Sequence, residues 1–284
     1  MTDGDAVLME NEGAETPLRL PIHQAIASIE RDGYCHIPGV FDERRIRRAL
    51  ELTRRWYDRT KDRQTRDVPA LARNDHFVWN LQNKDVFFIE LLLSCDILES
   101  ILKHFLNDPW FKQIPAEDPN YIIRNYMARS SHARLPMHID SLVPYTGDHV
   151  FVMQASIILE DQDRVNGCTV VVPGSHRSGA FVDQSAFEKA VPLVSRAGDL
   201  IVWDSRIWHG ATENRSGGTR WALIGTFVRW WIKQGFNITG NLPERIYAGL
   251  SDKQRAVLGF CSIPHEDETR GIDMKRGYAS LERP

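Results

Sequence analysis

The sequence predicts a mainly β protein with flanking helices, and three observations lead to this fold class. Short runs rich in β-branched and aromatic residues fill the chain from residue 121 onward. Turns that contain Gly, Pro or Asp separate these runs. The part of the chain before residue 107 is instead mostly helical in its periodicity. Many short strands after a helical region favour a sandwich or jelly-roll core with helices on one outer face.

Each element follows from local sequence. Residues 21–31 are predicted to form a helix, residues 34–37 a short strand, and Asp42 is placed to cap a long helix that continues from Arg45. A further helical stretch covers residues 85–106, where apolar residues lie on almost every side, as in a helix buried against a sheet. The predicted strands after residue 120 are 121–127, 150–159, 169–172, 193–195, 200–204 and 221–232.

One predicted helix is unusually basic. Ten Lys or Arg residues occur between residues 44 and 66, and such a concentration is one way to bind a phosphate or coenzyme A. Glu51, Asp58 and Asp62 lie among them. We therefore favour the alternative, which is a solvated helix face with ion pairs.

Composition and charge narrow the function classes. The 284 residues are 42% hydrophobic and 26% charged, and the formal net charge is -3. These values are typical of a globular protein without a general attraction to nucleic acid or anionic lipid, so we expect neither as a partner. Residues 1–17 carry five acidic side chains and are predicted to be a disordered tail. Residues 18–284 contain no internal repeat, and we expect them to form a single domain.

The cellular setting is also an expectation from sequence. The first residues lack the basic and apolar regions of a secretory signal, and no window reaches eighteen apolar residues. Four cysteines are widely separated and have no C-x-x-C spacing. We expect a cytoplasmic protein that interacts with no membrane and keeps its cysteines as thiols. The sequence does not predict an oligomeric state.

His138-Ile139-Asp140 carries the strongest chemical signal in the chain. Side chains two residues apart on an extended strand point to the same face, so His138 and Asp140 can bind one ion. His209 follows the apolar run of residues 200–203, where a returning strand can deliver a second imidazole. Two imidazoles and one carboxylate on one face of an octahedral metal leave positions open, as in non-haem Fe(II) oxygenases. His-x-Asp alone is a weak motif because it also occurs by chance.

A longer segment between the two halves of this predicted site is more specific. Residues 166–176 read Asn-Gly-Cys-Thr-Val-Val-Val-Pro-Gly-Ser-His. With the spacing of the His and Asp residues, this segment resembles the phytanoyl-CoA dioxygenase family of Fe(II)- and 2-oxoglutarate-dependent oxygenases. Residues 32–40 and 250–260 add weaker similarity, so the resemblance covers most of the chain from residue 22 to residue 260. It implies a double-stranded β-helix, the cupin-like form of the jelly roll.

The resemblance also implies roles for individual residues. His138, Asp140 and His209 would bind Fe(II), and the cosubstrates 2-oxoglutarate and O2 would take the open positions. Arg220 follows His209 by eleven residues, which is the spacing usual in the family. Its planar guanidinium would grip the distal carboxylate of 2-oxoglutarate through two parallel hydrogen bonds. The alternative for Arg220 is a surface position beside a hairpin turn.

The remaining cosubstrate contacts are less defined. The family often has a small hydroxyl residue two positions after the distal histidine, where this chain has Ala211. Thr212 or Thr219 can substitute for it, and Asn125 lies on the strand that precedes the His138 segment. We take Thr212 and Asn125 as candidate 2-oxoglutarate contacts.

Three residues are candidates for contact with the substrate. His132 lies in a short loop before the metal motif that is predicted to cover the site, Ser141 follows Asp140, and Trp203 lies on the strand that leads to His209. For Trp203 the alternative is packing inside the barrel. The sequence does not distinguish a pocket residue from a core residue here.

The resemblance implies oxidation, most often hydroxylation, of an unactivated C–H bond, with release of succinate and CO2. The family acts on acyl-CoA thioesters, amino acids and natural-product intermediates, and the absence of a coenzyme A motif favours a small metabolite or natural product. Related halogenases have Gly or Ala in place of Asp140, so this carboxylate favours hydroxylation, desaturation or ring formation. The alternatives are an acyl-CoA hydroxylase, a non-catalytic jelly-roll protein that binds a metal or ligand, and a nucleic-acid demethylase, which would require a basic surface.

Overall fold

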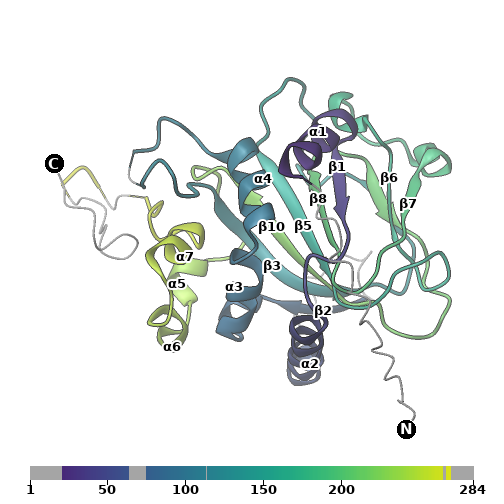
Figure 1. Cartoon of the computed structure of the whole chain (residues 1–284), viewed down its shortest axis with the longest axis horizontal. Helices are drawn as coiled ribbons and strands as arrows, with labels where there is room; N and C mark the ends of the chain where they lie inside the picture. Colours follow the sequence, from purple (N-terminus) through teal and green to yellow (C-terminus); the bar gives the residue numbers. More distant parts are fainter. Residues whose placement is uncertain (1–20, 64–74, 113, 265–266, 270–284) are drawn as a thin grey trace, which may run out of the picture.

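Two antiparallel β-sheets form the centre of the molecule in the computed structural model (Figure 1). The structure describes residues 21–63, 75–112, 114–264 and 267–269. The predicted acidic tail, residues 1–17, lies outside the described residues. The two sheets and their covering helices confirm the predicted jelly roll with helices on its outer face.

Every named pairing within the two sheets is antiparallel. The major sheet has six strands, in the spatial order β1 (Tyr34–Ile37), β8 (Leu200–Asp204), β5 (Val152–Ile158), β10 (Ala222–Val228), β3 (Ile122–Ser130) and β2 (His76–Trp79). The minor sheet has four, in the order β4 (Leu135–His138), β9 (His209–Ala211), β6 (Thr169–Val171) and β7 (Val191–Leu193).

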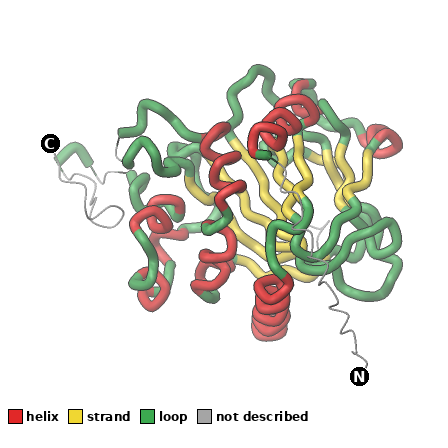
Figure 2. Tube along the Cα trace, in the orientation of Figure 1, coloured by secondary structure: helices red, strands yellow, loops and turns green. Residues whose placement is uncertain are grey.

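Helices cover the outer face of the major sheet, as Figure 2 shows for the red segments in front of the yellow strands. The α-helices are α1 (Ile22–Asp32), α2 (Glu43–Thr60), α3 (Val86–Leu93), α4 (Asp96–Leu106), α5 (Ile238–Asn241), α6 (Glu244–Tyr247) and α7 (Asp252–Val257). The 3-10 helices in the described part of the chain are η1 (Lys61–Arg63), η3 (Leu81–Asn83), η4 (Ser175–Arg177) and η5 (Gln184–Lys189). Asp42 caps α2 as predicted, because its carboxylate accepts a hydrogen bond from the Arg45 backbone N–H at 2.9 Å.

Apolar side chains form two layers on opposite faces of the major sheet. Ala155, Val202 and Leu223 point outward and pack with the helices. Ile158 and Ile201 point inward and pack with side chains of the minor sheet. Neighbouring strand residues alternate between the two faces. The inner face therefore forms the wall of the space between the sheets, where the predicted site lies.

The structure differs from the sequence prediction at several elements. Residues 85–106 form two helices, α3 and α4, because the backbone is extended at Cys95, with φ -92° and ψ 96°, and α4 begins anew at Asp96. β10 ends at Val228, earlier than predicted. The prediction missed β2, β4 and β9, which have three or four residues each. Runs this short have too few residues to show a period of two.

The basic helix α2 carries ion pairs, in agreement with the solvated-face interpretation. Lys61 lies 3.3 Å from Asp58, as predicted, and Arg47 lies 2.6 Å from Glu43 on the same face. The four cysteines are buried and none forms a disulfide bond. Among the described residues, no helix is both long and apolar enough to cross a membrane.

Candidate metal centre

Strand pairing brings the three predicted ligands together. β4 and β9 are antiparallel neighbours in the minor sheet, and His138 lies directly opposite His209 in their register. Asp140 follows β4 by two residues, and its backbone N–H donates to the Ser205 carbonyl at 2.8 Å. Gly210 permits this close pairing, because a Cβ atom there would lie 2.7 Å from the Leu135 carbonyl oxygen. Two segments about 70 positions apart therefore meet at one point.

The donor atoms of these side chains form a compact cluster. Nε2 of His209 lies 3.2 Å from Oδ2 of Asp140, and Nε2 of His138 lies 3.6 Å from Oδ1 of the same carboxylate. One candidate ligand atom from each residue lies within 4.8 Å of the other two. Two imidazoles and one carboxylate at this separation fit a divalent first-row metal with open positions.

The two histidine rings are held in the orientation that metal binding needs. Nδ1 of His138 lies 2.9 Å from the Pro136 carbonyl oxygen, and Nδ1 of His209 lies 3.0 Å from the Ile207 carbonyl oxygen. A carbonyl oxygen only accepts hydrogen bonds, so each Nδ1 carries the proton in the neutral ring. The lone pair of each Nε2 is then free to point at an ion beside Asp140.

The local electrostatics also favour a cation at this position. Burial lowers the pKa of His138 to about 4, and the nearby His209 adds to this effect. Burial opposes ionisation of Asp140, but His209 and His138 outweigh it and hold the pKa of that carboxyl well below its usual range. Burial lowers the pKa of His209, but attraction to Asp140 outweighs it and the net shift is upward. The ionised carboxylate thus attracts positive charge, which a divalent cation can supply.

A cavity of about 640 Å³, including its open mouth, joins this cluster to Arg220. The Arg220 side chain is buried, with 6% of the residue exposed. Its Nε donates to the Ser131 carbonyl at 3.1 Å, and its Nη2 is buried without a hydrogen-bond partner. Among the described residues, no carboxylate lies within ion-pair distance of this guanidinium. Burial, and next the positive charge of Arg129, lower the pKa of Arg220 to about 10.

Comparison with known proteins identifies the family. The sequence matches the phytanoyl-CoA dioxygenase (PhyH) family over residues 29–222. The chain belongs to the phytanoyl-CoA dioxygenase family. The members of this family are Fe(II)- and 2-oxoglutarate-dependent oxygenases that also use O2, and the resemblance seen in the sequence is confirmed.

Individual relatives support the same class. The chain is 22% identical to the dioxygenase af480 of Aspergillus fumigatus over 259 residues, which are 87% of this chain and 79% of that protein. It is 35% identical to the uncharacterized protein Rv1501 of Mycobacterium tuberculosis over 118 residues, or 40% of this chain. That match spans only 43% of the mycobacterial protein, less than half of its length.

Solved structures share the fold at low sequence identity. The α-ketoglutarate-dependent epimerase SnoN from nogalamycin biosynthesis aligns with a TM-score of 0.58 at 20% identity, covering 78% of this chain and 90% of its own. HygX from Streptomyces hygroscopicus, solved with nickel and 2-oxoglutarate bound, aligns with a TM-score of 0.57 at 15% identity, covering 74% and 88%.

Not every residue predicted for this phytanoyl-CoA dioxygenase homologue lies on the cavity. Trp203 lines it, and its ring centroid lies 5.6 Å from that of His209. His132 instead packs edge-on against His76, with a centroid distance of 4.5 Å. Ser141 donates to the Val143 carbonyl and is not among the residues that line the cavity.

The two secondary cosubstrate candidates also lie away from the cavity lining. The Thr212 hydroxyl accepts a hydrogen bond from the Cys168 backbone N–H at 2.9 Å, so it braces β9 against the start of β6. Asn125 lies on β3 beside Thr226 of β10, farther along the strand than the residues that line the cavity. The structure thus gives Thr212 a structural position, and Asn125 is not among the residues that line the cavity.

Sequence reasoning missed several residues of this cavity. Met127 and Arg129 line it from β3, and Gln154 and Ser156 line it from β5. Each pair is two residues apart, which is the strand period, so the alternation along β3 and β5 was the available signal. Arg129 is not free, because its Nη2 lies 2.6 Å from Oδ2 of Asp75.

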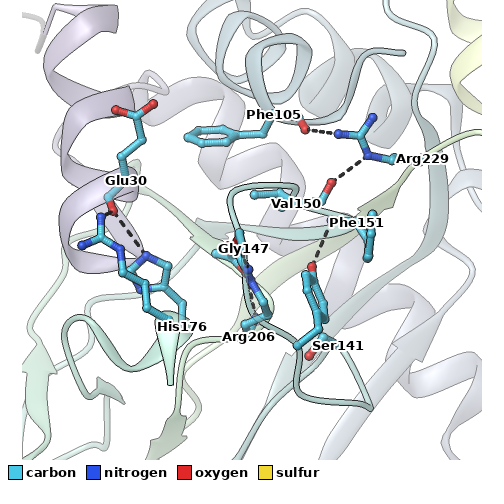
Figure 3. A network of polar contacts seen from close by, with 12 residues as sticks. Glu30, Phe105, Ser141, Gly147, Val150, Phe151, His176, Arg206 and Arg229 are labelled. Carbon is cyan, nitrogen blue, oxygen red and sulfur yellow. Dashed lines mark hydrogen bonds and ion pairs between the residues drawn. The ribbon is translucent and has the colours of Figure 1, made fainter. Parts of the chain in front are cut away.

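Two arginine side chains hold part of the segment that follows Asp140 (Figure 3). Arg206 donates to the Gly147 carbonyl at 2.7 Å, and Arg229 donates to the Val150 carbonyl at 2.8 Å. Arg206 is itself held by Asp204, whose Oδ2 lies 2.6 Å from its Nη2. Residues 147–150 are thus held by one buried and one half-buried guanidinium group.

Proposed function

We propose that this enzyme hydroxylates an unactivated C–H bond of a small metabolite or natural-product intermediate. The observation that carries the proposal is one cavity with two complementary ends. At one end lie two imidazoles and a carboxylate, and at the other lies a buried guanidinium without a carboxylate partner. A 2-oxoglutarate molecule has a chelating end and a distal carboxylate, which match these two ends in chemistry.

Each residue has a definite role in this proposal. His138, Asp140 and His209 would hold Fe(II), and the donor set fits that ion. When bound, Fe(II) with 2-oxoglutarate supplies activation of O2, coupled to the release of succinate and CO2. Arg220 would orient the distal carboxylate, because its free Nη2 and its planar fork suit a bidentate contact.

The cavity wall supplies the remaining specificity. Ala211 and Ala222 leave room beside Arg220, and the Trp203 ring closes the side next to His209. Gln154 is held by the Thr226 hydroxyl, which donates to its Oε1 at 2.7 Å. This fixed amide presents polar atoms to the cavity where a substrate would approach the metal.

Related enzymes use the same fold for different outcomes. SnoN is described as an epimerase and SnoK as a carbocyclase, both α-ketoglutarate dependent, whereas af480 is named a dioxygenase. The HygX structure holds hygromycin B, a small molecule. Hydroxylation is the outcome that we propose for this chain, and the product mass distinguishes it from the other two.

The test begins without oxygen. Purified protein receives Fe(II) and then 2-oxoglutarate under anaerobic conditions, and we expect a visible charge-transfer absorption that is lost in His209→Ala and retained in His149→Ala. His149 is an exposed histidine of the segment after Asp140, so it is a matched control. A wild-type protein that binds Fe(II) without developing this absorption would contradict the assignment.

The second stage admits air and a panel of small metabolites. Turnover is measured as the release of succinate, and the molecular mass of the product is determined by mass spectrometry. Gain of one oxygen atom supports hydroxylation. A product that has lost two hydrogen atoms would indicate ring closure, and a product of unchanged mass would indicate epimerisation. Either result would contradict hydroxylation.

A further inference from the structure

A second, larger hollow lies at one end of the major sheet. It has a volume of about 1590 Å³ including its open mouth. We call it the aromatic groove and define it by the side chains that dominate its wall, which are Phe111, Ile122, Trp230, Trp231, Phe236 and Ile263. In Figure 1 these segments lie near α5 and α7, at the end of β3 and β10 remote from β6 and β7.

The aromatic groove opens on the same face of the major sheet as the metal cavity. Ile122 and Val152 both pair with Val228, and the three side chains pack together. Thr226 lies two residues before Val228 on β10. It pairs with Gln154, which lies two residues after Val152 on β5 and lines the metal cavity. Residues two apart on a strand share a face. The groove and the cavity therefore lie one after the other along the same face of the major sheet.

One strand pairing and one ring contact lie between these two parts. Met127 lines the metal cavity and lies opposite Trp79 in the pairing of β3 with β2. The Trp79 ring lies 5.6 Å from the ring of Phe236, which lines the groove. Asn125 lies between the two regions on β3, and its neighbour Arg124 accepts a hydrogen bond through its carbonyl from the backbone N–H of Gly235, which lines the groove, at 3.0 Å.

The chemistry of the groove wall is mostly apolar and aromatic. Trp230 stacks on Phe111 with a centroid distance of 4.4 Å, and its indole N–H donates to Asp108 at 3.1 Å, so the ring is fixed. Trp231 is 54% exposed beside it. Among the described residues of the lining, Lys233 is the one charged side chain. A groove of this kind cannot neutralise several phosphates or the two charges of an amino acid.

We propose that the aromatic groove binds the body of the substrate, and that this substrate is a flat, largely apolar polycyclic molecule. The proposal rests on the oxygenase function proposed above and names its substrate class. Flat rings match the stacked aromatic side chains, which contribute more than their buried area alone. From Ile122 to Met127 the strand rises roughly 15 Å. A substrate anchored in the groove must therefore be extended to present a carbon atom to the metal cavity.

Binding to the groove is measured directly, independently of turnover. Equilibrium dialysis of the full-length protein against a hydroxyanthraquinone gives its Kd, with decanoyl coenzyme A and leucine as competitors. Trp231→Ala is compared with Trp110→Ala, which removes an indole that is 86% exposed and lies outside the groove lining. Thr239→Trp fills the groove from α5 without removing an aromatic ring.

We expect Trp231→Ala and Thr239→Trp to raise the Kd for the anthraquinone at least about tenfold, and Trp110→Ala to leave it unchanged. All three variants should keep the anaerobic Fe(II)–2-oxoglutarate absorption. Equal binding by wild type and Trp231→Ala would overturn the proposal, as would displacement of the anthraquinone by leucine or decanoyl coenzyme A. Anthraquinone binding that occurs only after removal of residues 270–284 would also overturn it, because the groove would then belong to the chain's own C-terminal segment. If the wild-type protein does not develop this absorption, the oxygenase function is contradicted, whereas the measured Kd for the anthraquinone is unaffected.

Discussion

Replacement of Arg220 by Met separates the binding role of this side chain from any structural role. Met has a similar length and no charge, so it fills the site but cannot bind a carboxylate. We expect two opposite effects from this one change. Affinity for 2-oxoglutarate should fall, and the stability of the protein without cosubstrate should rise.

The affinity change follows from the lost hydrogen bonds. Two charge-assisted bonds to a carboxylate contribute about 2 kcal/mol each, so the loss is about 4 kcal/mol, or about a thousandfold in Kd. Arg220→Lys keeps the charge without the planar fork and should cost about tenfold. Arg215→Met is the control, since that side chain lies on the adjacent hairpin turn and is 75% exposed.

The stability change has the opposite sign. Burial lowers the pKa of Arg220 from 12.5 to about 10, so the folded protein disfavours the charged form by about 3 kcal/mol. This penalty applies at every pH below the lowered pKa, and Met removes it. The lost hydrogen bond to Ser131 offsets about 1 kcal/mol. The net gain of about 2 kcal/mol corresponds to a rise in Tm of about 4 °C.

Two measurements check the reasoning. Anaerobic titration with 2-oxoglutarate gives Kd from the visible absorption, and differential scanning calorimetry without cosubstrate gives Tm. If Arg220→Met binds 2-oxoglutarate within threefold of wild type, or unfolds at a lower temperature than wild type, then the guanidinium is a structural element and the role proposed for it is wrong.

Three further predictions concern groups around the site. Burial of Asp199 opposes its ionisation, but hydrogen bonds from a histidine and two backbone N–H groups outweigh it and lower its pKa from 3.8. The ionised Asp199 should contribute fully to the free energy of unfolding above about pH 4, and this contribution should decline as the pH falls through the lowered pKa. The free energies of unfolding of wild type and Asp199→Asn, measured in urea, should therefore become equal in acid. Gly167→Ala should lower the free energy of unfolding by about 2 kcal/mol because the φ of Gly167 is +86°. It should also weaken 2-oxoglutarate binding, because the added Cβ would lie 3.1 Å from the Arg220 Nε. Gly217→Ala is the control and should leave binding unchanged, because nothing lies within 4 Å of a Cβ at that position. Asp75→Ala should lower the free energy of unfolding by about 3 kcal/mol because it leaves Arg129 unpaired at the cavity, and an unchanged denaturation midpoint would contradict this.

Local sequence patterns carried much of the fold prediction. Helical periodicity placed α1 and α2, and runs rich in β-branched and aromatic residues placed β5 and β8, close to their observed bounds, because each element is long enough or apolar enough to be recognised. The strands β4 and β9 were missed although they carry His138 and His209. With three or four residues each, they form because they pair with one another and with β6, which is a nonlocal property.

The sequence by itself supplied the prediction of which residues form the site. The spacing of His138 and Asp140 predicted two metal-binding side chains that point the same way, and the resemblance to the family supplied the role of Arg220. A motif of close residues can be recognised in a single chain. The structure brings these side chains to one cavity, and their roles as ligands and anchor remain for the experiments above to test.

Only the tertiary structure decided which other residues reach that cavity. Arg129 and Gln154 line it, whereas His132 and Ser141 do not, although the latter are closer to the metal motif in sequence. The alternation of side chains along a strand shows which residues share a face. It does not show which strand is the neighbour, because register and strand order in a sheet depend on the packing of segments that are distant in sequence. For the same reason the aromatic groove, built from segments around residues 111, 122, 230 and 263, has no signature in any one stretch of the sequence.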